Sequence, residues 1–173
     1  VDGDLTGKLC GARRPGHFRG VATVVTKLIN ITEADRAFFG QKDAQQVVVI
    51  KRFVRDLNLN VQVEMVPIVR AANGLALSSR NAYLTEPEKV AALVLSQSLQ
   101  QARELFVGGE KQAEVLKDFV RKYIGQEKMA QIDYVEIYTF PELSEVKIIA
   151  KPCLLAIAVK IGKVRLIDNM ILE

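Results

Sequence analysis

The sequence predicts an α/β protein, with a small parallel sheet followed by a small α+β domain that has an antiparallel sheet. Strand, loop, helix and strand follow one another from Arg36 to Val66, the size of a βαβ unit, whose right-handed crossover makes the two strands parallel. Beyond Val66, helical segments are followed by several strands close together in the sequence, as expected for helices packed on an antiparallel sheet. We place the domain boundary near Val66, which gives domains 1–66 and 67–173.

The composition limits the kinds of protein this chain can be. Its 173 residues are 49% apolar and 25% charged, which suits one or two small globular domains and excludes a disordered chain. No apolar run approaches the ~18 residues of a membrane span, and residues 1–20 lack a signal-peptide pattern, so we expect a soluble, cytoplasmic protein with no membrane partner. Cys10 and Cys153 belong to no CxxC motif or Cys/His cluster, so neither a disulfide scaffold nor a zinc site is predicted.

The net charge is concentrated in one short segment. The chain carries a net charge of +4, and the basic residues between positions 8 and 20, where no acidic residue occurs, account for all of it. A protein that binds nucleic acid usually spreads its basic residues along a face. We therefore expect no nucleic acid partner, and the single basic loop favours a small anion.

The first domain opens on a stretch rich in Gly and Arg, Val1 to Gly20, which predicts a loop. A one-sided helix is predicted from His17 to about Ile31, because apolar residues recur there at helical spacing. These residues are Phe18, Val21, Ala22, Val25, Leu28 and Ile29. Their face either covers the core or takes part in a subunit interface.

The βαβ unit comes next. The strand Arg36–Gly40 turns at Gly40–Asp43 into a helix over about Ala44–Leu57, and Val61–Val66 predicts the second strand. Ligands of such sheets bind at the carboxyl ends of the strands. The Gly40–Asp43 turn is therefore a candidate site on topology alone.

The second domain begins with a helix. Thr85 and Glu88 have the spacing of a capping box, and the helix they introduce runs to about Phe106 before a Gly-Gly pair. A second helix is predicted over about Ala113–Ile124, and strands over 131–140, 152–161 and 164–172. Alternation in the first of these strands puts Ile132, Tyr134, Glu136 and Tyr138 on one face and Val135 and Ile137 on the other.

Two polar clusters in the first domain suit an anion, and each has an ordinary alternative. Arg14 and His17 stand at the start of the first helix, where a guanidinium and the helix dipole favour an anion, although a solvated basic loop fits equally well. Lys42 suits a phosphate in the strand-to-helix turn. From the residues alone we nevertheless favour a helix cap there, since Asp43 and Gln46 have the spacing of a capping box.

The third cluster is the run LSSRN at 77–81, whose hydroxyls and guanidinium suit phosphate oxygens, although the bare pattern is common in surface turns.

Taken in order, the clusters resemble the pantothenate synthetase family. The residues that carry the resemblance are RPGHFRG at 14–20, FFGQKDAQQ at 38–46, PIVRAANGLALSSRNAYL within 66–84, and RLIDN at 165–169. Together they cover almost the whole chain.

The resemblance implies a fold and an activity. Members of this family belong to the nucleotidylyltransferase superfamily and have a Rossmann-like half that handles ATP, so the first domain would be the C-terminal part of that half. They are ligases that join pantoate to β-alanine, using ATP and Mg²⁺ through a pantoyl-adenylate intermediate, and they are usually homodimers. We expect the same reaction, substrates and association for the protein to which this chain belongs.

The resemblance also implies roles for single residues. Lys42 would face the ATP phosphates, Asp43 and its neighbours would hold phosphate and ribose, and Val69 would present its backbone to the adenine. Gln46 would bind pantoate, and Arg14 and His17 would line the pocket near the acyl group. The implied ATP-binding residues are Gly40, Gln41, Lys42, Asp43, Val69, Leu77, Ser78, Ser79 and Arg80, of which Lys42, Ser78, Ser79 and Arg80 would be catalytic; none is implied as a metal ligand.

The sequence departs from the family pattern in two ways. The family usually has Glu where Gln41 stands, a difference that does not threaten the chemistry, and Met or Leu where Leu77 stands. Its HxGH signature, which contacts ATP, lies in an N-terminal segment that has no counterpart here, so we expect a C-terminal portion with little or no activity alone. The alternatives are another adenylyl- or cytidylyltransferase of the same superfamily, or a non-catalytic module that self-associates.

Overall fold

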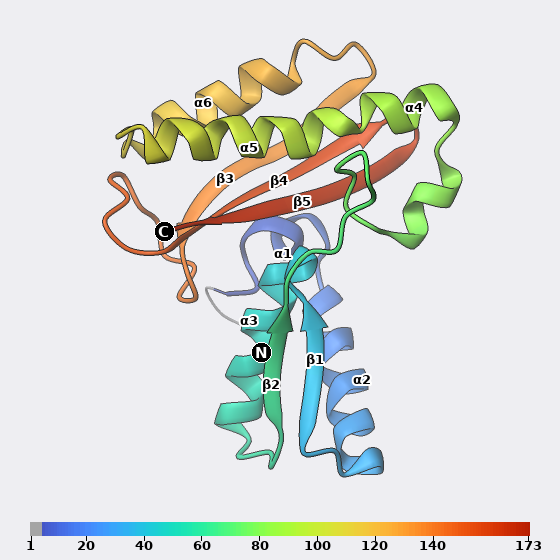
Figure 1. Cartoon of the computed structure of the whole chain (residues 1–173). Helices are drawn as coiled ribbons and strands as arrows, with labels where there is room; N and C mark the ends of the chain where they lie inside the picture. The colour runs from blue at the N-terminus through green and yellow to red at the C-terminus, as the bar shows by residue number, and fades with distance from the viewer. Residues whose placement is uncertain (1–4) are drawn as a thin grey trace. The chain divides into compact units, whose positions relative to one another are not determined.

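The computed structural model describes residues 5–173 and falls into two compact units, Val1–Pro67 and Ile68–Glu173 (Figure 1). Each unit has its own hydrophobic core. The first contains a small parallel sheet with helices, and the second contains an antiparallel sheet with helices, which confirms the predicted α/β class. None of the helices formed by the described residues is both long enough and apolar enough to cross a membrane.

The first unit is built around two parallel strands, β1 (Arg36–Gly40) and β2 (Gln62–Val66). The helix α3 (Ala44–Asp56) connects them, as predicted, after the short turn η1 (Gln41–Asp43). The helix α2 (His17–Thr32) precedes β1. The buried residues that the two helices and the sheet share are Phe18, Ala22, Ile29, Val49, Ile50, Phe53, Val54 and Val63.

The helix α2 has the predicted length, and most of its predicted apolar face covers the core. Phe18, Ala22 and Ile29 are buried, whereas Leu28 is 54% exposed. The prediction of a loop from Val1 to Gly20 is wrong at Leu9–Arg13, which forms the short helix α1, and its first four residues lie outside the described part of the chain.

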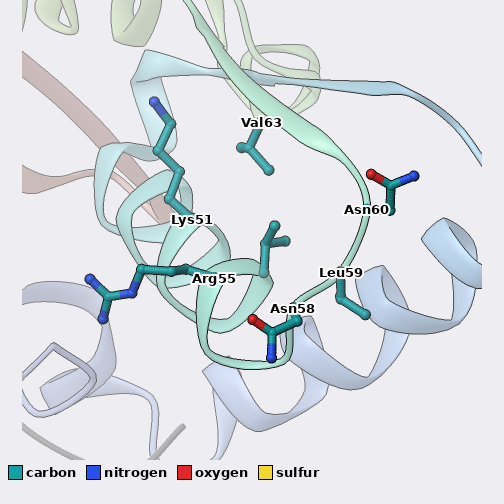
Figure 2. A pocket seen from close by; sticks show the side chains of 7 residues that line it. Lys51, Arg55, Asn58, Leu59, Asn60 and Val63 are labelled. Carbon is teal, nitrogen blue, oxygen red and sulfur yellow. The ribbon is translucent and has the colours of Figure 1, made fainter.

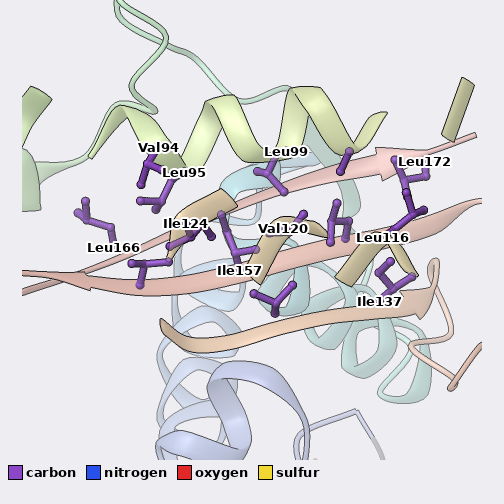
Figure 3. Packing of buried hydrophobic residues seen from close by; sticks show 14 of the residues in the cluster. Val94, Leu95, Leu99, Leu116, Val120, Ile124, Ile137, Ile157, Leu166 and Leu172 are labelled. Carbon is purple, nitrogen blue, oxygen red and sulfur yellow. The ribbon is translucent and has the colours of Figure 1, made fainter. Parts of the chain in front are cut away.

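The second unit has the sheet order β3-β4-β5, with antiparallel neighbours. The strands are β3 (Ala130–Thr139), β4 (Cys153–Ile161) and β5 (Val164–Leu172). The helices α5 (Leu93–Val107) and α6 (Ala113–Ile124) pack on one face of this sheet. Figure 3 shows Leu99 from α5 and Val120 from α6 directed at the strands, where Ile157 is fully buried.

Two details of the second unit differ from the sequence prediction. The helix introduced by Thr85 is interrupted at Ala92, because Leu95 N donates to Ala92 O across a tighter turn; it becomes α4 (Glu86–Ala91) and α5. The face predicted for Ile132 is also wrong. A bulge shifts the register between Ile132 and Tyr134, so Ile132 pairs with the buried Val159 and packs on the core beside Val135 and Ile137.

Candidate functional site

The Gly40–Asp43 segment lies at the carboxyl end of the parallel sheet. Gly40 ends β1 and pairs with Val66, the last residue of β2, so the two strands end at the same edge. A Cβ added to Gly40 would meet no heavy atom within 4 Å, so packing inside the chain does not require glycine here. The absence of a side chain instead lets a ligand approach the backbone closely.

The turn after Gly40 combines a cation with a helix start. Gln41–Asp43 form η1, in which Lys42 is half-buried, and α3 begins at Ala44 with its first amide groups directed toward the same edge. A lysine beside a helix N-terminus creates a positive potential. This edge of the sheet therefore suits an anion such as a phosphate.

The favoured helix cap at this turn is wrong. Asp43 occupies the N-cap position of α3, but its side chain makes no capping hydrogen bond. The physical reason is the 3₁₀ turn before it, which gives Asp43 a φ of −100° and a ψ of 49° instead of the extended backbone of a capping residue. The Asp43 carboxylate is exposed at the carboxyl end of the sheet, and helix capping does not account for it.

Gln45, which the sequence analysis overlooked, is a structural residue beside this turn. It is 6% exposed, and its Nε2 donates to Leu5 O over 2.8 Å and to Lys8 O over 2.7 Å. Its Oε1 accepts from Gly11 N over 3.3 Å. The sequence does contain a sign that Gln45 is structural. It stands four positions before the buried Val49, which puts a polar side chain on the apolar face of the helix. Gln45 thus fixes the segment before α2 to the start of α3, while Gln46 is only half-buried.

Arg14 and His17 are brought together by the turn between α1 and α2. Arg14 Nη1 lies 3.2 Å from His17 Nε2. Because a guanidinium can only donate, this contact requires a lone pair on Nε2 and therefore the tautomer protonated at Nδ1. Gly16 has a φ of 78° and makes the left-handed turn before α2, so that His17 is the first residue of that helix.

The predicted phosphate loop of the second unit follows a small hairpin. Val69 O accepts from Leu77 N over 2.9 Å, and both side chains are exposed. Ser78 then caps η2 (Ser79–Tyr83), its Oγ accepting from Arg80 N over 3.2 Å. The Ser79 and Arg80 side chains are not buried, so a hydroxyl and a guanidinium are presented to solvent on one short turn.

An open hollow of about 570 Å³ also lies in the first unit, between the end of α3 and β2 (Figure 2). It is lined by Lys51, Val54, Arg55, Asn58, Leu59, Asn60 and Val63. They come from the later part of α3, the segment that follows it, and Val63 near the amino end of β2, away from Gly40–Asp43, and none is a predicted site residue. The hollow therefore does not belong to the candidate site.

Comparison with known proteins identifies the family. The sequence model of Pantoate-beta-alanine ligase matches residues 1–171. The chain belongs to this ligase family. The pantothenate synthetase of Pelotomaculum thermopropionicum is 61% identical over 168 residues, which are 97% of this chain and 60% of that protein. The pantothenate synthetase of Clostridium acetobutylicum is 56% identical over 165 residues, 95% of this chain and 59% of that protein.

Solved structures of pantoate–β-alanine ligases have the same fold. The pantothenate synthetase of Thermus thermophilus is 38% identical and gives a TM-score of 0.94, covering 98% of this chain and 61% of its own. The pantoate–β-alanine ligase of Francisella tularensis, in complex with β-γ ATP and β-alanine, is 30% identical with a TM-score of 0.69, covering 98% of this chain and 57% of its own. This chain therefore spans about 60% of the length of the curated ligases it matches.

The predicted ligase residues lie in both units. Gly40, Gln41, Lys42 and Asp43 form one turn, with Gln46 on the first turn of the following helix, and Arg14 contacts His17. In the second unit, Val69 is hydrogen-bonded to Leu77, directly before Ser78–Arg80. Among the described residues, no group of three or more His, Cys, Asp or Glu side chains is placed to hold a metal ion.

Proposed function

We propose that the protein containing this chain joins pantoate to β-alanine, forming pantothenate, AMP and pyrophosphate. The observation that carries this proposal is the lysine-bearing turn at the carboxyl end of the parallel sheet, in a chain that belongs to the pantoate–β-alanine ligase family. The complex of the Francisella tularensis relative with β-γ ATP and β-alanine supports it. Because the chain spans about 60% of its curated relatives, the activity is proposed for the whole protein.

The proposed roles follow the position of each residue. Lys42 stabilises charge on the ATP phosphates, and the exposed Asp43 carboxylate accepts hydrogen bonds from the ribose. Gly40 leaves space for the nucleotide beside the end of β1. Gln46 binds pantoate from the first turn of α3, and the Arg14–His17 pair lines the pocket near the acyl group.

The second unit supplies the other proposed contacts with ATP. The Val69 backbone faces the adenine, with Leu77 on the other strand of the hairpin. Ser78, Ser79 and Arg80 add hydroxyl and guanidinium donors to the phosphates. These assignments rest on the family motif and on the solvent accessibility of Val69, Leu77, Ser79 and Arg80.

The reaction needs positioning and charge stabilisation more than acid or base catalysis. The pantoate carboxylate attacks the α-phosphorus of ATP and pyrophosphate leaves, while negative charge grows on the phosphate oxygens near Lys42 and Arg80. The β-alanine amine then attacks the acyl carbon and AMP leaves, which requires the two substrates to be held close together with water excluded. We propose that Mg²⁺ enters with ATP as part of the substrate, bound mainly by phosphate oxygens and water.

The test of this proposal is pantoate-dependent exchange of labelled pyrophosphate into ATP, measured on the complete gene product that contains this chain. Exchange with pantoate but with no other small carboxylic acid is expected. The K42A variant should lower the exchange rate by at least about a hundredfold, the size of a lost transition-state donor. Exchange that prefers another acid would contradict the proposed substrate, and an unaffected K42A variant would contradict the role of Lys42.

We also propose that the protein forms a homodimer through α2. Val24, Leu28 and Ile31 are 56%, 54% and 75% exposed, and their spacing puts them on one face of the helix. The L28E variant should lower the weight-average mass in sedimentation equilibrium, whereas V107E, at an exposed apolar residue on α5, should not. Unchanged association of L28E would contradict this interface. We place the protein in the cytoplasm, in keeping with Cys10 and Cys153 both being reduced.

A further inference from the structure

An ion pair joins Arg70 to Asp168 across the second unit. Arg70 Nη1 donates to Asp168 Oδ2 over 2.7 Å, and Nη2 donates to Oδ1 over 2.9 Å. The two residues are 98 positions apart, and the Asp168 side chain is only 3% exposed. Two parallel hydrogen bonds fix the direction of the guanidinium as well as its distance, so this pair defines an orientation.

Asp168 is the fixed member of the pair. It lies inside β5, where its Oδ1 also accepts from Asn169 N over 2.8 Å. Its neighbour across the ladder is Ile157 in the fully buried part of β4. The sheet therefore fixes the position of the Asp168 carboxylate, and the hairpin has to place the Arg70 side chain beside it.

Arg70 lies on the first strand of the hairpin from Val69 to Leu77, next to Val69. It pairs with Ala76 in an isolated antiparallel bridge, and its Nη1 also donates to Gly74 O over 3.2 Å at the turn. One guanidinium thus binds both the tip of the hairpin and β5. Of the hairpin residues, only Leu75 and Ala76 are buried, while Val69 and Leu77 are 63% and 53% exposed. Side-chain packing at Val69 and Leu77 therefore does little to hold the ends of the hairpin.

We propose that Arg70 and Asp168 are a positioning pair, which orients the Val69–Leu77 hairpin on β5 so that Val69 and the Ser78–Arg80 turn receive the adenine and phosphates of ATP. The ligand in this inference rests on the proposed function; the positioning rests on the geometry alone. Buried ion pairs stabilise a fold little more than apolar replacements do. Orientation of the hairpin explains this pair better than stability does.

The variants R70K and D168N test the pair. R70K keeps the charge and loses the two-pronged contact, and D168N keeps the shape and loses the charge. The double variant R70Q/D168N removes both charges together, so it still tests the pair if one of the single variants fails to fold. The matched control is D133N, because Asp133 binds Arg165 Nε and Nη2 over 2.9 Å and 2.8 Å in the same sheet but joins β3 to β5.

Amide hydrogen exchange is the first readout, since it needs no ligand. Residues 69–80 should exchange about tenfold faster in R70K and D168N, with much smaller changes in α5 and β4, because a lost charged hydrogen bond opens the local segment. The D133N variant should leave residues 69–80 unchanged. Unchanged exchange in the hairpin, or an equal increase in every segment, would overturn the positioning role.

ATP affinity is the second readout. R70K and D168N should bind Mg·ATP about tenfold more weakly than the parent chain, and D133N should bind within about twofold of it. Weaker exchange protection with unchanged ATP affinity would overturn the link between the hairpin and the nucleotide. If neither the parent chain nor the complete gene product binds ATP, that result contradicts the proposed function, and the exchange measurement still decides whether the pair positions the hairpin.

Discussion

The backbone of Gly162 lies directly against the carboxylate of Glu88, since a Cβ added to Gly162 would overlap Glu88 Oε1. Gly162 makes the tight turn between β4 and β5 with a φ of 56°, and Glu88 closes the capping box of α4 by accepting from Thr85 N over 2.8 Å. The hairpin tip of the sheet and the start of the helix layer therefore meet at a position that favours glycine.

The first prediction concerns this contact. G162A should lower the free energy of unfolding by about 1–3 kcal/mol, because alanine is strained at positive φ and displaces the Glu88 carboxylate. Chemical denaturation measures the change. G20A is the control: Gly20 lies inside α2 with no heavy atom near its Cβ position, so alanine should stabilise by up to about 1 kcal/mol. Equal stability of G162A and the parent would contradict the close contact.

The second prediction is a pH dependence from the same capping box. The hydrogen bond from the Thr85 backbone, followed by that from its hydroxyl, holds the pKa of Glu88 below its ordinary value of 4.5. A lowered pKa means that the folded state binds the proton less readily than the unfolded one, so this stabilisation is complete above pH 4.5 and is lost as pH falls through the lowered pKa.

The E88Q variant isolates that contribution. The difference in unfolding free energy between the parent and E88Q should be largest above pH 4.5 and should shrink as pH falls below that value. Denaturation curves at several pH values measure it. A difference that stays constant across this range would show that the Glu88 charge does not act through the cap.

The third prediction separates two neighbouring glutamines. Q45A removes the hydrogen bonds that Gln45 makes with Leu5 O, Lys8 O and Gly11 N, the last of them buried, so it should destabilise the first unit by about 1–3 kcal/mol. Q46A should change stability by less than about 0.5 kcal/mol, because its side chain is half-exposed on the helix. In the complete gene product, Q46A should instead raise the KM for pantoate.

The opposite result for these variants is equally informative. If Q46A destabilised the fold as much as Q45A, Gln46 would be a structural residue. Its proposed role in binding pantoate would then lose its support.

The fourth prediction follows from the missing cap at α3. D43N and D43A should leave the melting temperature within about 1 °C, since Asp43 makes no capping hydrogen bond and a lost cap would cost about 1 kcal/mol. Both should weaken Mg·ATP binding, because the amide and the methyl group cannot replace a charged acceptor for the ribose. A clear drop in melting temperature with unchanged ATP affinity would restore the capping interpretation.

Periodicity predicted most elements, and local geometry explains where it failed. The strands Arg36–Gly40 and Val164–Leu172 and the helix Ala113–Ile124 were predicted with the bounds they have, because their apolar patterns agree with their packing. The face of Ile132 could not be predicted, since one inserted residue reverses the alternation and leaves no mark in composition. The interruption at Ala92 is similarly invisible in a sequence rich in helix formers.

The site was predicted through motifs, and its supporting contacts were not. The turn bearing Lys42 follows from topology, but Asp43 has the sequence spacing of a cap and lacks the backbone conformation for it. Gln45 and the Arg70–Asp168 pair depend on partners 34 to 98 positions away in the chain, which no local pattern reveals. Such contacts can be identified only in the folded structure.

Calorimetric titration of this chain with Mg·ATP tests the central claim, that the turn after β1 binds a nucleotide phosphate. The account predicts binding by the parent chain and by K51A, whose lysine is exposed on α3 and lines the hollow away from the candidate site. It predicts at least about tenfold weaker binding by K42A, the cost of one lost charge-assisted contact. Equal affinity of K42A and K51A, or no binding by the folded parent chain, would contradict it.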